Sequence, residues 1–130
     1  MAKGSRILII DDDENIRRVL ETILTDEGYI VESADNAAKG IEKSEKAFFN
    51  LALIDVRLPD MEGIEVLSKL RGTKPKMRKI IVTGYPTLQN AINAVNKGAN
   101  AYVMKPLDVE KNSSNNQGTI AKAAGREELH

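Results

Sequence analysis

The chain contains no cysteine, and its only histidine is the last residue, His130. Without cysteine there can be no disulfide framework, no thiolate metal site and no cysteine nucleophile. A single terminal histidine also excludes a histidine-based catalytic triad and a histidine metal cluster. Long apolar runs are absent too: the run Ile7–Ile10 near the start is far too short for a membrane span or a signal-peptide core. We therefore expect a cytoplasmic protein with no membrane partner.

An excess of one charge is also missing. Lysine plus arginine and aspartate plus glutamate each number 19 among the 130 residues, so the formal net charge is zero. A balanced charge gives no general attraction to nucleic acid. No DNA-binding segment is recognisable either, so we expect no direct nucleic acid binding by this chain. Its length suits one domain with a single good core.

Strand-like and helix-like segments alternate through most of the chain. Uninterrupted aliphatic runs in the first, third and fourth predicted strands indicate burial on both faces of a sheet. Shorter or mixed apolar runs predict the second and fifth strands. Apolar residues at helical spacing lie between these strands, and in the second predicted helix we expect Ala37, Ala38 and Ile41 to point inward. Strict alternation predicts an α/β fold with a parallel sheet and helices on both faces. The predicted strands are Ile7–Ile10, Tyr29–Ser33, Leu51–Ile54, Ile80–Val82 and Ala101–Met104, and the helices fall near 16–24, 36–41, 64–70 and 88–95.

The C-terminal stretch breaks this alternation. The polar segment 112–118, NSSNNQG, has the composition of a linker, and Ile120 and Leu129 are the only large aliphatics beyond Val109. We therefore expect a domain at 1–111, with its core at 6–108, and an irregular tail at 112–130 whose closing helix is short or atypical. Without such a helix, apolar surface is left for a partner or a second copy of the chain to cover, so a homodimer is one expectation.

Polar side chains are predicted at the carboxyl ends of four strands, which meet at one edge of a parallel sheet. Asp11 and Asp12 follow the first strand, Asp55 the third, Thr83 the fourth and Lys105 the fifth. Each has a simpler explanation taken alone: acidic residues cap helices, threonine caps turns, and lysine is usually solvated. Their joint occurrence at the ends of four strands favours a functional site.

The chemistry open to such a set is narrow. Clustered carboxylates repel one another, and a hard cation such as Mg²⁺ relieves the repulsion through oxygen ligands. One carboxylate can also act as a nucleophile and form an aspartyl phosphate. Asp55 is ionised at neutral pH and needs no base. The metal, Lys105 and the Thr83 hydroxyl can neutralise the charge that develops during phosphoryl transfer.

Four motifs carry these residues: ILIIDDDEN, LALIDVRLPDMEG, IIVTG and AYVMKP. Together they resemble the receiver domain of two-component response regulators, over about residues 6–108. The resemblance implies a flavodoxin-like, doubly wound sheet of five parallel strands in the order 2-1-3-4-5. It also implies that Asp55 accepts a phosphoryl group from a sensor histidine kinase or a histidine phosphotransfer protein, with Thr83 and Lys105 completing the catalytic set.

The same resemblance implies the metal site. Mg²⁺ would be held by Asp12, Asp55 and the backbone carbonyl of Arg57, with Asp11 acting mainly through an ordered water. The peptide bond between Lys105 and the following Pro106 is expected to be cis.

The resemblance also implies a conformational switch. Phosphorylation would draw Thr83 inward, and Tyr102 would fill the vacated space, which changes the surface formed by the fourth helix and fifth strand. From the residues alone, a plain aromatic at a strand edge is the preferred explanation of Tyr102. A downstream effector is therefore expected to bind this surface, although the sequence does not identify it.

The main alternative is an enzyme, a haloacid-dehalogenase-type phosphatase, in which Asp11, Asp13, Thr83 and Lys105 would serve. That family's first motif continues with threonine or valine where Glu14 stands here, and Asp55 would have no role. An interaction module that needs no phosphorylation is disfavoured by the complete acidic set. A dinucleotide-binding domain is disfavoured because no glycine-rich turn follows the first strand. We expect a phospho-accepting signalling domain rather than an enzyme.

Overall fold

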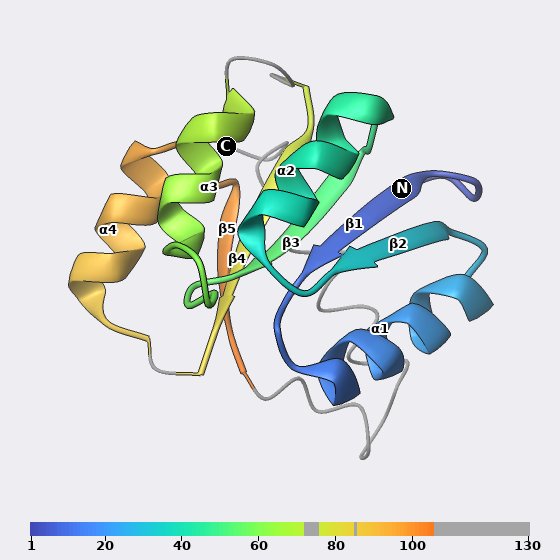
Figure 1. The fold of residues 1–130 in the computed structure, drawn as a ribbon, viewed down its shortest axis with the longest axis horizontal. Coiled ribbons are helices and arrows are strands. Elements are labelled where there is room, and N and C mark those ends of the chain that lie inside the picture. Colours follow the sequence, from blue (N-terminus) through green and yellow to red (C-terminus); the bar gives the residue numbers. More distant parts are fainter. Residues whose placement is uncertain (72–75, 85, 106–130) are drawn as a thin grey trace.

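The computed structural model describes residues 1–71, 76–84 and 86–105, which form a parallel sheet covered by helices on both faces (Figure 1). Its five strands lie in the order β2-β1-β3-β4-β5, as the resemblance to receiver domains implied. In these ranges no helix has both the length and the apolar character needed to cross a membrane. The elements are β1 (Arg6–Ile10), α1 (Glu14–Asp26), β2 (Ile30–Ala34), α2 (Ala37–Lys46), β3 (Leu51–Asp55), α3 (Gly63–Arg71), β4 (Arg78–Thr83), α4 (Leu88–Asn96) and β5 (Ala101–Met104).

Alternation along the central strands produces two cores, one on each face of the sheet. Helix α1 covers one face, and α2, α3 and α4 cover the other (Figure 1). Ile7 and Ile9 of β1 point to the first core, whereas Leu8 and Ile10 point to the second. All four are at most 1% exposed, and full burial of such a side chain contributes about 1.5–3 kcal/mol. This explains why β1 reads as an unbroken aliphatic run.

Backbone hydrogen bonds extend the sheet just beyond its strand ends and fix the loops that follow. The Asp11 N–H donates to the Ala34 carbonyl at 3.1 Å, and the Lys105 N–H donates to the Thr83 carbonyl at 2.6 Å. Helix α1 then begins at once, because the Asp13 carboxylate caps it by accepting from the N–H groups of the next residues in its first turn. The groups at this edge of the sheet are therefore held by the ladder itself.

Several details differ from the sequence prediction: β4 begins at Arg78, earlier than expected, and α2 continues to Lys46. The second strand is shifted one residue toward the C-terminus and lies at the sheet edge, as its mixed composition indicated. Ala38 was wrongly expected to face inward: it is exposed, because α2 buries Ala37, Gly40 and Ser44 on a face that turns away from it.

Helix α4 presents its large aliphatics outward. Leu88, Ile92 and Val95, whose spacing predicted the helix, are 78%, 44% and 63% exposed. Its buried contact is made by the small residue Ala94. An amphipathic pattern predicts where a helix lies in the sequence, but it does not predict which face of the helix packs against the sheet. Met104, the last residue of β5, is 61% exposed as well.

Several predictions fall outside the described residues. They are the helix stop at 72–75, the cis bond before Pro106, and the form of the segment from 106 to 130.

Candidate functional site

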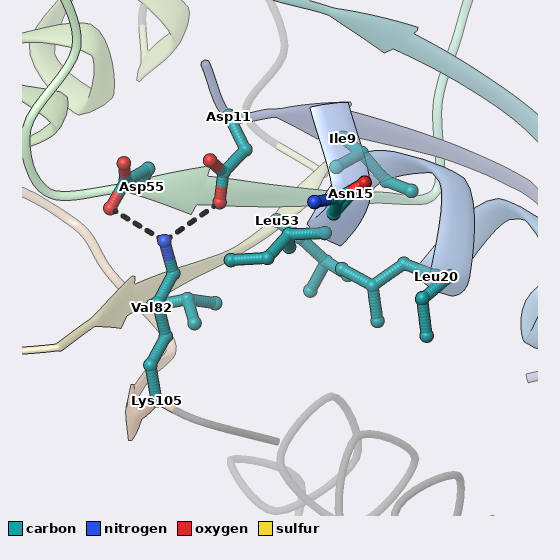
Figure 2. Close-up of a pocket in the computed structure, with 10 residues that line it drawn as sticks. Ile9, Asp11, Asn15, Leu20, Leu53, Asp55, Val82 and Lys105 are labelled. Atoms are coloured by element: carbon teal, nitrogen blue, oxygen red, sulfur yellow. Dashed lines mark ion pairs between the residues drawn. The ribbon is translucent and has the colours of Figure 1, made fainter. Parts of the chain in front are cut away.

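Two carboxylates and one ammonium group meet at the carboxyl edge of the sheet. The Nζ atom of Lys105 lies 2.9 Å from Oδ2 of Asp11 and 3.3 Å from Oδ1 of Asp55 (Figure 2). Asp11 and Asp55 are only 4% and 8% exposed. They stand at the ends of the neighbouring strands β1 and β3. After β1 the chain continues to β2 on one side of this pair, and after β3 it continues to β4 on the other side. This is the position where doubly wound sheets bind ligands.

The ion pairs form one end of a pocket between α1 and the sheet. Apolar side chains make up most of the rest of its wall, including Ile9, Leu53 and Val82 from three strands (Figure 2). A low-dielectric wall strengthens every charge interaction beside it. The three charged groups are thus coupled more tightly than they would be on an open surface.

Burial and charge act on the two partners in different ways. Burial raises the pKa of Asp55 above its ordinary value, and the negative charge of Asp11 raises it further, against the opposing effect of Lys105. Burial alone would lower the pKa of Lys105. The hydrogen bond and charge of Asp11, with a smaller contribution from Asp55, outweigh burial, so the pKa of Lys105 lies above its ordinary value. Negative charge is in excess at this site, and the lysine remains protonated.

The carboxylates are grouped as a divalent-cation site requires. Oxygens of Asp11, Asp12 and Asp55 lie within 4.8 Å of one another. Asp11 is buried and Asp12 is exposed, so one side of the group faces solvent. The backbone N–H of Arg57 lies near enough to the Asp55 carboxylate to lower its pKa, so the Arg57 peptide is beside the same group. This all-oxygen set fits Mg²⁺, which keeps several waters and takes one or two carboxylates.

The two expected switch residues occupy adjoining strands. Thr83 is the last residue of β4 and is fully buried. Tyr102 of β5 is paired in register with Ile81, which lies two residues before Thr83 in β4. The Tyr102 ring packs partly buried against the core on the α2–α4 face. Its hydroxyl is buried and has no hydrogen-bond partner among the described residues. Tyr102 is therefore an aromatic of the edge strand β5 whose hydroxyl is buried.

Sequence reasoning missed two residues that support this edge. The Arg17 guanidinium donates to the backbone carbonyl of Asp11 at 2.7 Å, and so ties α1 to the acidic turn. Asp60, in the loop after β3, accepts from the N–H groups of Ala37 and Ala38 at 2.8 and 2.9 Å. Asp60 follows a proline and reads as an ordinary turn residue. The residues around Asp60 in the sequence give no sign that its hydrogen-bond partners lie more than 20 positions away.

A sheet of this order, with buried acids and a lysine at its switch point, defines the class of flavodoxin-like phospho-accepting domains. Residues 7–114 match the response regulator receiver domain, and the chain belongs to this family. It is 38% identical over 111 residues to the uncharacterized transcriptional regulatory protein YkoG of Bacillus subtilis, covering 85% of this chain and 48% of YkoG. The chain thus spans about half or less of the curated relatives it matches.

Solved structures agree with this assignment. A CheY-like receiver domain protein from Methanospirillum hungatei has a TM-score of 0.86 and 45% identity, and 98% of each chain is covered. The response regulator TrrA from Thermotoga maritima, in complex with Mg(2+)-BeF, has a TM-score of 0.77 and 27% identity, with 92% of this chain and 98% of TrrA covered. The chain is a receiver domain of two-component signalling, a family whose standard function is to accept a phosphoryl group.

Proposed function

We propose that Asp55 is the phosphoryl acceptor and that a histidine kinase or histidine phosphotransfer protein is the donor. A carboxylate oxygen of Asp55 attacks the phosphorus of a phosphohistidine, the P–N bond breaks, and the imidazole nitrogen leaves with the electron pair. Water later attacks the acyl phosphate and releases inorganic phosphate. The observation that carries this proposal is the buried Asp55 carboxylate, which shares the Lys105 ammonium with Asp11.

The surrounding residues have distinct tasks in this scheme. Asp12, Asp55 and the Arg57 carbonyl would hold Mg²⁺, with Asp11 acting through a water; the bound ion would supply positive charge for the phosphoryl oxygens. Lys105 would pair with the phosphoryl group, and the Thr83 hydroxyl would donate to it. Proximity of Arg57 to Asp55 and the grouping of the carboxylates support this assignment.

The surface of α4 and β5 is our candidate for the output face. Movement of Thr83 toward a phosphoryl group would change the packing of Tyr102, which lies beside the core under α4. The exposed aliphatics Leu88 and Val95 give this face an apolar surface for an effector or a second copy of the chain. Phosphorylation would thereby be read at a distance from Asp55.

A phosphatase is less well supported by the geometry. Its mechanism would need Asp13 at the reacting centre, yet the Asp13 carboxylate accepts from the N–H groups of Asn15 and Ile16 at the start of α1. We therefore infer a signalling domain that undergoes only its own phosphorylation and dephosphorylation, working in the cytoplasm. We assign this role to residues 1–111.

The test is mass spectrometry after incubation with acetyl phosphate and Mg²⁺. The parent should gain one adduct of phosphate mass that hydroxylamine removes, and Asp55→Asn should gain none. Asp26→Asn, at the exposed end of α1, is the matched control and should behave as the parent. An adduct that persists in Asp55→Asn would overturn the assignment, and turnover of a generic phosphate ester would favour the phosphatase.

A further inference from the structure

The loop that follows Asp55 is attached to helix α2 by one side chain. Both carboxylate oxygens of Asp60 are used: Oδ1 accepts from the Ala37 N–H at 2.8 Å and Oδ2 accepts from the Ala38 N–H at 2.9 Å. These bonds hold the pKa of Asp60 below its ordinary value. Its carboxylate is therefore ionised at neutral pH, as an acceptor of two backbone N–H groups must be.

The cap of α2 is divided between near and distant residues. Asn36, the residue before the helix, caps only the Lys39 N–H, at 2.8 Å. The Ala37 and Ala38 N–H groups have no partner within their own helix, and Asp60 supplies the acceptor for both. Asp60 therefore caps the first two N–H groups of α2, as Asn36 caps the third. Unlike Asn36, Asp60 belongs to the loop that follows Asp55.

This loop carries the backbone of the proposed metal site. At its start Val56 donates its N–H to Val82 at 3.1 Å, and at its end the Gly63 N–H returns to the Val56 carbonyl at 2.7 Å. Arg57 forms an isolated bridge with Glu62 across the loop. The contacts of Gly63 and Glu62 join the end of the loop to its start, and the Val56 contact joins its start to β4. Asp60, at its tip, joins it to the α2 side of the sheet.

We propose that Asp60 is a positioning residue for the phosphoacceptor site: by anchoring the loop to α2 it fixes the Arg57 peptide relative to Asp55. This inference rests on the proposed function, because it concerns the Mg²⁺ site described there. The two N–H groups of α2 are part of a regular helix packed on the sheet, so they provide a rigid reference. Without the anchor, the Arg57 carbonyl samples more positions and the metal site is ordered less of the time.

Three variants separate positioning from helix capping. Asp60→Ala removes both bonds to α2, and Asp60→Asn keeps one acceptor oxygen. Asn36→Ala is the matched control, because it removes a cap from the same helix end without touching the loop. Amide NMR of each protein gives the loop shifts without metal and the Mg²⁺ dissociation constant on titration, and urea unfolding gives the stability.

We expect Asp60→Ala to shift the metal-free amides of residues 57–62 and to weaken Mg²⁺ binding about tenfold, the usual scale for losing a supporting residue. Asp60→Asn should lie between Asp60→Ala and the parent. Asn36→Ala should lower the urea midpoint yet bind Mg²⁺ as the parent does. Equal Mg²⁺ affinity in Asp60→Ala and the parent would overturn the inference and leave the proposed function intact. A parent that takes up neither Mg²⁺ nor a phosphoryl group would overturn both.

Discussion

The Lys105 ammonium lies closer to Asp11, at 2.9 Å, than to Asp55, at 3.3 Å. The single lysine offsets only part of the negative charge of the two acids. A phosphoryl group on Asp55 would bring more negative charge and more acceptor oxygens to that side, and would draw the ammonium from Asp11 toward it. We therefore expect the position of Lys105 to change when Asp55 is phosphorylated.

Lys105→Met should destabilise the metal-free protein at pH 7. The substitution leaves two buried carboxylates without their cation, and we expect the free energy of unfolding to fall by roughly 2 kcal/mol. The pKa of Lys105 is raised, so its contribution is complete below the ordinary value of 10.5 and is lost as the pH rises through the folded-state pKa. Urea unfolding in EDTA measures the difference. Lys76→Met, an exposed lysine, should change stability by no more than about 0.5 kcal/mol.

Asp55→Asn should have the opposite effect on the metal-free protein. Because burial and Asp11 raise the pKa of Asp55, its charged form is less favourable in the folded state, and the parent loses stability as the pH rises from about 3.8 through the folded-state pKa. An uncharged amide avoids this loss, so the variant should be more stable at pH 7, on the order of 1 kcal/mol. Below pH 3.8 the gain should vanish. A gain that is independent of pH would show that charge is not its origin.

Added Mg²⁺ should reverse that ranking. At an ion concentration ten times the dissociation constant, binding to the folded parent adds about 1.4 kcal/mol to its stability. Asp55→Asn has lost one charged ligand and should gain less. The comparison needs only urea curves with EDTA and with Mg²⁺, and parallel shifts in the two proteins would contradict the assignment of Asp55 to the metal site.

The alternation of strands and helices and the main site were predictable from local patterns, whereas the order of the strands came from the resemblance to receiver domains. Aliphatic runs marked the strands, and the topology of parallel strands then gathered Asp11, Asp55 and Lys105 at one edge, where they indeed form ion pairs. The contacts of Asp60 and Arg17 were not predictable. They join segments through backbone groups, which every residue carries, so no residue type announces the partner.

The outward face of α4 was hidden for a different reason. Its aliphatics recur with helical spacing, but Leu88 and Val95 are exposed while the sheet takes Ala94. Hydrophobic periodicity records that one face is apolar, whether a sheet or a partner covers it. Among the residues that the structure describes, the sheet does not cover the apolar face of α4 that carries Leu88 and Val95.

Tyr102→Phe should leave the metal-free protein as stable or more stable. The hydroxyl of Tyr102 is buried and lacks a hydrogen-bond partner among the described residues, and removing such a group relieves up to about 1 kcal/mol of desolvation cost. Thermal unfolding with and without beryllofluoride and Mg²⁺ measures the effect in both states. A loss of stability in the metal-free protein would mean that the hydroxyl has a partner after all.

Gly63 and Gly84 make a matched pair at the site, because only one of them is sterically constrained. A Cβ at Gly63 would overlap the Asp55 carbonyl oxygen and lie 3.0 Å from the Val56 Cα, so α3 would have to move away from β3. At Gly84 a Cβ would meet no atom within 4 Å.

Gly63→Ala should therefore lower the free energy of unfolding by roughly 3 kcal/mol, since backbone atoms cannot yield as a flexible side chain does. Gly84→Ala should change it by no more than about 0.5 kcal/mol. Because the displaced backbone belongs to Asp55, Gly63→Ala should also slow phosphorylation by acetyl phosphate in whatever fraction remains folded, and Gly84→Ala should still be phosphorylated to completion. Normal stability and normal phosphorylation of Gly63→Ala would show that the close packing of α3 against the end of β3 does not position Asp55.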